Sequence, residues 1–202
     1  MNRIRVAGPA RLHMGMFDLA GSLGRRFGGI GATIDWPQVV IEADLSDELR
    51  VDGPDCDRAR LYAQRYLQAN DIMTGATLTI LEDIPAHVGL GSGTKLALTV
   101  ASALATLYGK TTDPYVLAQD VGRGSRSAIG LWTFAQGGFV VEGGQWPDRE
   151  DVAPLLVRYA MPASWRCVLA IPQTSPGLSG QKEKEAFQQL APPREQAAAI
   201  TH

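Results

Sequence analysis

A glycine-rich loop that feeds directly into an apolar helix constrains the fold of this chain more than any other feature. Residues 84–109 read IPAHVGLGSGTKLALTVASALATLYG. Glycine lets backbone N–H groups turn inward, and the start of a helix adds unpaired N–H groups and a positive dipole end. We therefore predict a phosphate-binding loop whose contacts come from Gly89, Gly91, Ser92, Gly93, Thr94 and Lys95. A tight strand-to-helix turn, in which the glycines only relieve strain, is the alternative.

The loop has neither of the two common nucleotide-binding spacings. The G-x-x-x-x-G-K-[ST] pattern of a Walker loop is absent, and no G-x-G-x-x-G opens the helix. The residues therefore predict an anion site without specifying a nucleotide.

Composition indicates an ordinary globular protein and excludes several function classes. Of 202 residues, 45% are apolar and 20% are charged, and the net charge of −2 provides no general polycation for nucleic acid. Cys56 and Cys167 fit no metal or redox spacing, and the three histidines are too scattered for a metal cluster. The start lacks the apolar core of a signal peptide, and residues 96–108 are too short to cross a bilayer. We expect a cytoplasmic protein with small-molecule substrates, no nucleic acid and no membrane partner.

Hydrophobic periodicity predicts an α+β fold, because strands and helices are both present but do not alternate strictly. Residues 57–71 carry apolar side chains at helical spacing, and a second helix follows the loop over residues 94–108. Shorter helices are predicted at 112–122, with Thr112 or Asp113 as N-cap, and at 125–136. The strands are predicted at residues 3–6, 12–16, 37–45, 76–82, 137–144 and 165–172. The sequence also predicts turns at Gly21, Gly24, Gly28 and Gly29, a surface connection over residues 146–154 and a solvated helix that begins near residue 180.

The segment from 122 to 138, GRGSRSAIGLWTFAQGG, contains no acidic residue. Arg123 and Arg126 instead carry guanidinium forks suited to phosphate or carboxylate, and we predict that they bind substrate together with Ser125. Surface ion pairs are the alternative role for the two arginines.

The stretch PAHVGLGSGTKLAL resembles the phosphate loop of the GHMP kinase superfamily, although Gly93, Thr94 and Lys95 depart from its usual sequence. The resemblance implies an aspartate that serves the attacking hydroxyl from a G-x-x-S-G-x-D segment, but the corresponding residues 122–138 supply no proton acceptor. The resemblance implies an N-terminal domain of the ribosomal protein S5 domain 2-like fold, followed by a ferredoxin-like C-terminal domain. We expect the first over residues 1–160 and an incomplete start of the second over residues 161–202.

Three blocks together resemble a more specific family, the β-ribofuranosylaminobenzene 5′-phosphate synthases of methanopterin synthesis. The blocks are ARLHMGMFDLAGSLGRRFGGIGATID, GLGSGTKLAL and GRGSRSAIG with the following FAQGGFVVEGG, and the match spans about residues 4 to 144. The resemblance implies condensation of phosphoribosyl pyrophosphate with 4-aminobenzoate or 4-hydroxybenzoate, with loss of pyrophosphate and CO2. It also implies Mg²⁺, and a homodimer is one option for the assembly.

The N-terminal block supplies further candidate site residues. We predict catalytic roles for Asp18, as a Mg²⁺ ligand or a stabiliser of the cationic sugar, and for Arg25, as a grip on phosphate or carboxylate. Arg11 and His13 are predicted to bind substrate. The alternatives are an Asx turn at Asp18, a solvated surface position for Arg25 and a core position for His13.

Two other functions remain open at this stage. A divergent GHMP small-molecule kinase would use ATP and would need a carboxylate from outside the acid-free segment. A non-catalytic phosphometabolite-binding module would bind such ligands without turning them over.

Overall fold

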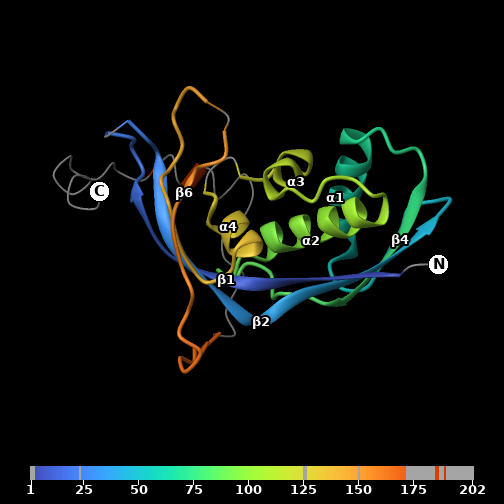
Figure 1. Ribbon diagram of the computed structural model, residues 1–202, viewed down its shortest axis with the longest axis horizontal. Helices are drawn as coiled ribbons and strands as arrows, with labels where there is room; N and C mark the ends of the chain where they lie inside the picture. Colours follow the sequence, from blue (N-terminus) through green and yellow to red (C-terminus); the bar gives the residue numbers. More distant parts are fainter. Residues whose placement is uncertain are drawn as a thin grey trace. The chain divides into compact units, whose positions relative to one another are not determined.

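The computed structural model describes residues 3–22, 24–124, 127–149, 151–171, 185–186 and 189. The chain divides into two compact units, each assembled from separate stretches of sequence (Figure 1). The first unit comprises Met1–Ala10, Asp35–Ile84 and Ser92–Gly124, and the second comprises Arg11–Ile34, Pro85–Gly91 and Ser125–His202. The two long strands β1 (Ile4–Asp18) and β2 (Phe27–Ser46) contribute residues to both.

The sheet of the first unit has the order β3-β4-β2. Strand β4 (Gly75–Glu82) pairs antiparallel with the second half of β2, and β3 (Arg50–Asp52) pairs parallel with β4. Three helices pack on one another in this unit: α1 (Cys56–Ala69), α2 (Ser92–Leu107) and α3 (Pro114–Asp120). The unit is a layer of helices associated with a mixed sheet, which confirms the predicted α+β class.

The helices of the first unit form where the periodicity predicts them. Helix α1 buries the five residues that the sequence placed on one stripe, namely Ala59, Tyr62, Ala63, Tyr66 and Leu67. Helix α2 is buried along most of its length, which explains its nearly continuous apolar sequence. Asp113 is the N-cap of α3, because its Oδ1 accepts a hydrogen bond of 2.8 Å from the N–H of Tyr115.

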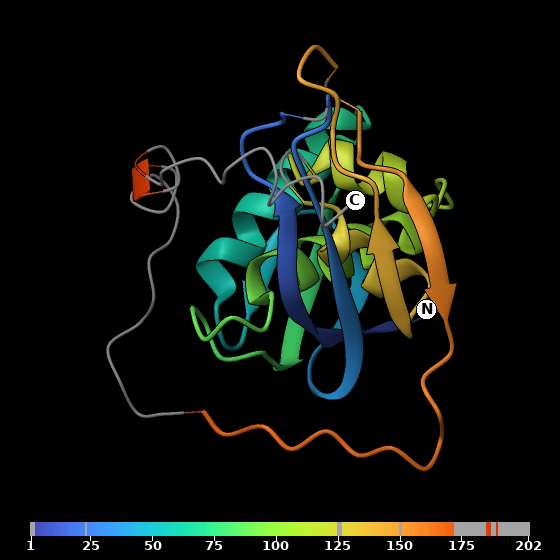
Figure 2. The same ribbon diagram turned by 90° about the vertical axis from the view of Figure 1, so that its left-hand side faces the viewer.

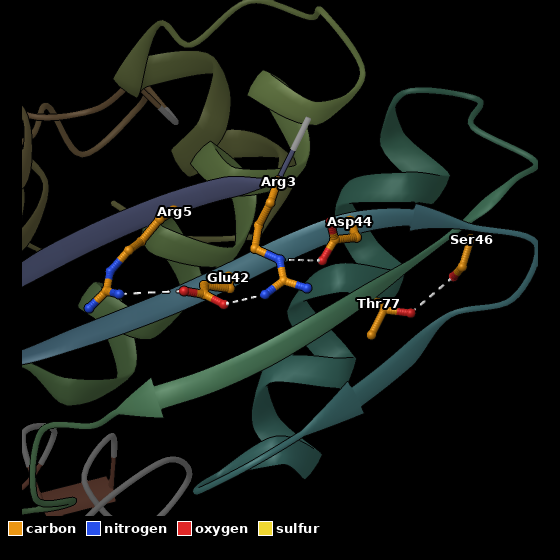
Figure 3. A network of polar contacts seen from close by, with 6 residues as sticks. All are labelled: Arg3, Arg5, Glu42, Asp44, Ser46 and Thr77. Atoms are coloured by element: carbon orange, nitrogen blue, oxygen red, sulfur yellow. Dashed lines mark hydrogen bonds and ion pairs between the residues drawn. The ribbon is translucent and has the colours of Figure 1, made fainter. Parts of the chain in front are cut away.

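A polar network lies over β1 and β2 in the first unit (Figure 3). The guanidinium of Arg3 binds Glu42 at 3.2 Å and Asp44 at 3.0 Å, and Arg5 binds Glu42 at 3.4 Å. Both arginines are largely exposed, so these ion pairs contribute little to stability. Their regular cross-strand spacing instead reflects the pairing of β1 with β2.

The second unit has the strand order β2-β5-β6. The first half of β2 pairs antiparallel with β5 (Phe139–Glu142), which pairs antiparallel with β6 (Leu155–Tyr159), as Figure 2 shows. Helix α4 (Ile129–Ala135) packs on β5. Its Trp132 is buried and donates a hydrogen bond of 2.9 Å from Nε1 to the carbonyl of Ala153.

Several predicted elements differ from the structure. The two strands predicted at 3–6 and 12–16 are one continuous strand, β1, and the glycines predicted to turn at Gly28 and Gly29 lie inside β2. Strand β6 was not predicted. The connection predicted to lie on the surface at 146–154 buries Val152 and Ala153 near its end.

The strand predicted at residues 165–172 is wrong for its described part, residues 165–171, which has no regular secondary structure. Its apolar side chains do not enter a core: Trp165 is 66% exposed and Val168 is 92% exposed. An apolar run forms a buried strand only where a neighbouring strand and a packing surface receive it. The helix predicted to begin near residue 180 lies largely outside the described residues. No helix in the described part of the chain is both long and apolar enough to cross a membrane.

Candidate functional site

The predicted phosphate loop follows β4 and ends at Ser92, the first residue of α2. Positive φ angles occur at His87 (61°), Gly89 (83°) and Gly91 (80°), so the backbone turns repeatedly in the left-handed region before the helix begins. The first turn of α2 carries no acidic side chain that would offset the positive end of the helix dipole.

Two guanidinium groups lie against the first turn of α2, and Gly93 makes room for them. A Cβ atom added to Gly93 would stand 3.2 Å from Nη2 of Arg123 and 3.5 Å from Nη1 of Arg58. Any larger residue at this position would therefore press on the arginine side chains. Within the first unit, the positive end of the helix and two fixed cations thus occupy the same small region, which is the arrangement that an oxyanion requires.

Arg123 follows α3, and a backbone hydrogen bond holds it against the end of that helix. The N–H of Arg123 donates a hydrogen bond of 2.7 Å to the carbonyl of Ala118. Its guanidinium donates to the hydroxyl of Tyr62 on α1, and the guanidinium carbon lies 5.0 Å from the centre of the Tyr62 ring. The sequence predicted Arg123 as an anion ligand, and within the first unit the structure places it beside Gly93 at the start of α2. Ser125 and Arg126 lie outside the described residues.

Arg58 was not predicted as a site residue. Its Nε donates to both carboxylate oxygens of Asp55, at 2.9 and 2.7 Å, and this hydrogen bonding raises the pKa of Arg58. Asp83 also interacts with Arg58, and burial raises the pKa of Asp83. Arg58 is therefore a cation partly neutralised by Asp55. The i, i+3 spacing of Asp55 and Arg58 at the start of α1 indicates an ion pair in the sequence. The sequence could not show that the start of α1 lies near the first turn of α2.

The remaining predicted ligands on α2 differ in accessibility. Ser92 is 6% exposed and Lys95 is fully buried, whereas Thr94 is half-buried. A fully buried ammonium must be compensated inside the protein, so Lys95 presents no charge to solvent. Its predicted contact with phosphate stays a prediction.

In the second unit, Arg11 packs against residues 89–91 of the loop. Its Nη1 donates a hydrogen bond of 2.5 Å to the carbonyl of Gly89, and its backbone N–H donates one of 3.1 Å to the carbonyl of Leu90. A Cβ atom on Gly91 would stand 3.1 Å from Cγ and Nε of Arg11. Arg11 therefore packs along residues 89–91 and fixes their backbone, a role that the prediction of substrate binding did not include.

Asp18 is fully buried and holds the turn that follows β1. Its Oδ1 accepts hydrogen bonds from the N–H groups of Ala20 (3.0 Å) and Gly21 (2.8 Å), and its Oδ2 accepts one of 3.1 Å from Ser22. This is the geometry of the alternative weighed for Asp18, an Asx turn. The predicted catalytic role stays a prediction.

Arg25 lies on the aromatic face of Trp146, with the guanidinium carbon 4.7 Å from the ring centre. Its Nη1 also lies 3.5 Å from the carbonyl oxygen of Gly143. Arg25 is therefore half-buried and fixed by Trp146 and Gly143, and it is not a solvated surface arginine.

His13 is a neutral side chain at physiological pH. Burial and the charge of Arg11 lower the pKa of His13 to about 4, and Gly15 opposes the shift. The ring atom Nε2 is buried and has no hydrogen-bond partner among the described residues. His13 can therefore accept a hydrogen bond at Nε2, but it supplies no positive charge for an anion.

Glu142 is a second residue that the sequence analysis missed. It is fully buried, and its Oε1 accepts a hydrogen bond of 3.1 Å from Ser127, so a carboxylate does reach the acid-free segment from outside. Burial raises the pKa of Glu142, although its hydrogen bonds oppose the shift. Strand alternation provides a signal, because Glu142 follows the buried Val140 by two residues and therefore shares its face.

The described residues offer no clustered cage for the predicted Mg²⁺. No group of three or more His, Cys, Asp or Glu side chains there could hold a metal ion. Both oxygens of Asp18 already accept hydrogen bonds from the turn. The prediction of Mg²⁺ itself stays a prediction.

Comparisons with known proteins agree on one family. Residues 58–136 match the family described as GHMP kinases N terminal domain. The β-ribofuranosylphenol 5′-phosphate synthase of Archaeoglobus fulgidus is 35% identical over 98% of this chain and 67% of its own length. That of Methanocaldococcus jannaschii is 33% identical over 96% of this chain and 67% of its own.

Solved structures show the same fold. The mevalonate kinase of Methanococcus jannaschii superposes with a TM-score of 0.52 at 17% identity, over 69% of this chain and 53% of the kinase. The chain therefore spans about two thirds of the length of these synthases and about half of that kinase. The structural likeness supports the expected GHMP-type N-terminal fold.

Proposed function

Because this chain belongs to the β-ribofuranosylphenol 5′-phosphate synthases, built on the GHMP kinase N-terminal fold, we propose that it condenses phosphoribosyl pyrophosphate with an aromatic acid. The products are a β-ribofuranosyl arene 5′-phosphate, pyrophosphate and CO2, in methanopterin biosynthesis. The names of the relatives specify a phenol. Of the two predicted acids, 4-hydroxybenzoate rather than 4-aminobenzoate gives that product.

The reaction balances without a base. The bond between C1 of the ribose and the pyrophosphate oxygen breaks, and pyrophosphate takes the electron pair. The ring carbon that bears the carboxylate bonds to C1, and CO2 leaves its bonding electrons on the ring. No proton moves in this sequence. The protein has to stabilise the charge that grows on pyrophosphate and orient the two reactants.

One observation supports this proposal most directly: the guanidinium of Arg123 lies against Gly93 in the first turn of α2. We assign a phosphate group of the substrate to the N–H groups of this turn, with Arg123 as its charged ligand and Arg58 as a weaker one because of Asp55. Arg25 is proposed to bind a phosphate or the arene carboxylate.

A specific observation also favours a kinase as the second candidate. Asp83 is half-buried beside Arg58, and its raised pKa is a property of general bases. Glu142 does not compete for this role, because it is fully buried and bonded to three protein groups. A divergent kinase would use Asp83 to receive the proton of a substrate hydroxyl.

One experiment distinguishes the two functions. The full-length protein is incubated with phosphoribosyl pyrophosphate, Mg²⁺ and 4-hydroxybenzoate labelled at the carboxyl carbon, with 4-aminobenzoate in a parallel reaction. The synthase predicts labelled CO2 that requires phosphoribosyl pyrophosphate and does not form with ATP. Folded protein that releases no CO2 from either acid would contradict the proposal. Arg123→Ala should lower kcat/KM by about 10- to 100-fold, the value of a charged hydrogen bond, and Asp83→Asn should leave the rate of a synthase largely unchanged.

The cellular location is proposed from the sequence, the metal from the resemblance, and the homodimer as one option for the assembly. We expect a cytoplasmic enzyme, a homodimer, and Mg²⁺ that enters with the pyrophosphate rather than through a protein cage. Residues 161–202 are proposed to begin a second domain.

A further inference from the structure

The buried carboxylate of Glu142 has no part in the reaction proposed above, yet it is bonded on both oxygens. It lies at the end of β5 and is fully buried in the second unit. A carboxylate so far from solvent is tolerated only when protein donors satisfy it. Its three partners belong to two segments of the chain: Ser127 and Ala128 on one side, and Gly144 on the other.

The first oxygen organises the start of α4. Oε1 accepts hydrogen bonds from the hydroxyl of Ser127 at 3.1 Å and from the N–H of Ala128 at 3.4 Å. Ala128 is the N-cap of α4, and the N–H of Ile129 donates to the Ser127 hydroxyl at 3.3 Å. The carboxylate thus holds the N–H of the N-cap residue and the Ser127 hydroxyl, which itself accepts from the first N–H of the helix.

The second oxygen organises the backbone that holds Arg25. Oε2 accepts a hydrogen bond of 2.9 Å from the N–H of Gly144, which has a φ of 72°. The preceding residue, Gly143, approaches Arg25 so closely that an added Cβ atom would stand 2.8 Å from Nη1. The carbonyl of Gly143 lies 3.5 Å from the same nitrogen, and Trp146 provides the ring on which Arg25 rests. Gly143, Gly144 and Trp146 therefore form the seat of Arg25.

We infer that Glu142 is a positioning residue that holds the seat of Arg25 in place while it fixes the start of α4. Glu142 touches no substrate and exchanges no proton. It acts through Gly144, which sets the path of Gly143 and of the chain that leads to Trp146. The inference rests on the proposed function only in taking Arg25 as an anion ligand.

The test is a double-mutant cycle between Glu142 and Arg25, with inorganic pyrophosphate as the probe and isothermal titration of the full-length protein as the measurement. Glu142→Gln has the same shape but keeps only one acceptor oxygen, so either Gly144 or the Ser127 and Ala128 pair loses its acceptor. We expect Arg25→Ala to weaken pyrophosphate binding about 10-fold or more and Glu142→Gln to weaken it about 3- to 10-fold. The double variant should bind no more weakly than Arg25→Ala alone. Glu48→Gln, the same change at an exposed side chain, is the control and should bind as the wild type does.

Two results would overturn the inference: wild-type affinity in Glu142→Gln, or a double variant whose loss is the product of the two single losses. The second result would mean that Glu142 acts on the fold and not through Arg25. If Glu142→Gln does not fold, Glu142→Asp, which keeps the charge but shortens the reach, enters the same cycle with the same criteria. Failure of the wild-type protein to bind pyrophosphate would instead contradict the proposed function, so the two failures are distinguishable.

Discussion

Replacing Gly93 with alanine should stabilise the fold but weaken anion binding, so this one substitution distinguishes the two effects. Gly93 is the second residue of α2 and has no left-handed φ, so alanine fits its backbone. Alanine is favoured over glycine in a helix by about 0.5–1 kcal/mol. The new Cβ atom would stand 3.2 Å from Nη2 of Arg123, which is tighter than ordinary contact. Arg123 must therefore move by a few tenths of an ångström.

The size of the binding loss follows from that displacement. Two unit charges about 4 Å apart interact by about 4 kcal/mol at an effective dielectric constant of about 20. A shift of about 0.3 Å reduces this by about 0.3 kcal/mol, or about 0.6 kcal/mol for a phosphate with two charges. Gly93→Ala should therefore bind pyrophosphate about threefold more weakly, while its Tm stays constant or rises by about 1–4 °C.

Gly109→Ala is the matched control, since Gly109 follows the other end of α2. Its φ is 63°, and no atom lies within 4 Å of a Cβ atom added there. Alanine in this left-handed conformation costs about 1–2 kcal/mol. Its Tm should fall while pyrophosphate affinity, measured by isothermal titration, stays at the wild-type value. If Gly93→Ala binds pyrophosphate as tightly as the wild type does, Arg123 is not a phosphate ligand and the reasoning is refuted.

Three further predictions concern the surroundings of the site. Arg11→Ala removes the hydrogen bond to the carbonyl of Gly89, so amide hydrogen exchange at residues 88–91 should become faster, and unchanged exchange would contradict the role of Arg11 in the loop. Burial lowers the pKa of His13 from 6.5 to about 4. Between pH 6.5 and pH 4 the unfolded chain therefore binds a proton at His13 that the folded protein does not bind. Stability should therefore fall as the pH drops from 6.5 to 4, and denaturant titrations of His13→Gln should show a smaller fall than the wild type. Asp113→Ala removes the N-cap of α3 and should lower the free energy of unfolding by about 1 kcal/mol, whereas an unchanged value would mean that this cap is not formed in solution.

Much of the fold could be predicted because local patterns and tertiary packing agree. The buried stripe of α1, the strand β4 and the helix after the glycine loop all follow from periodicity. The wrong strand at 165–171 and the missed strand β6 have one cause. Short apolar runs do not reveal whether a neighbouring strand exists to pair with them, since that is a property of the tertiary structure.

The candidate site could be predicted only where the motif lies in a continuous segment. Glycine spacing located the loop, and the resemblance to a family directed attention to Arg123. Arg58 and Glu142 were not predicted, because their roles depend on contacts with segments distant in sequence. Asp18 shows the converse case, in which a residue singled out by its motif is bonded to its own turn.

The most direct measurement of the central claim is a crystal structure of the full-length protein with bound phosphoribosyl pyrophosphate. The account predicts a phosphate group within hydrogen-bonding distance of the backbone N–H groups at the start of α2 and of the Arg123 guanidinium. A sugar pyrophosphate bound with no phosphate at this turn would contradict it. So would a complex in which ATP occupies the turn and Asp83 faces a substrate hydroxyl.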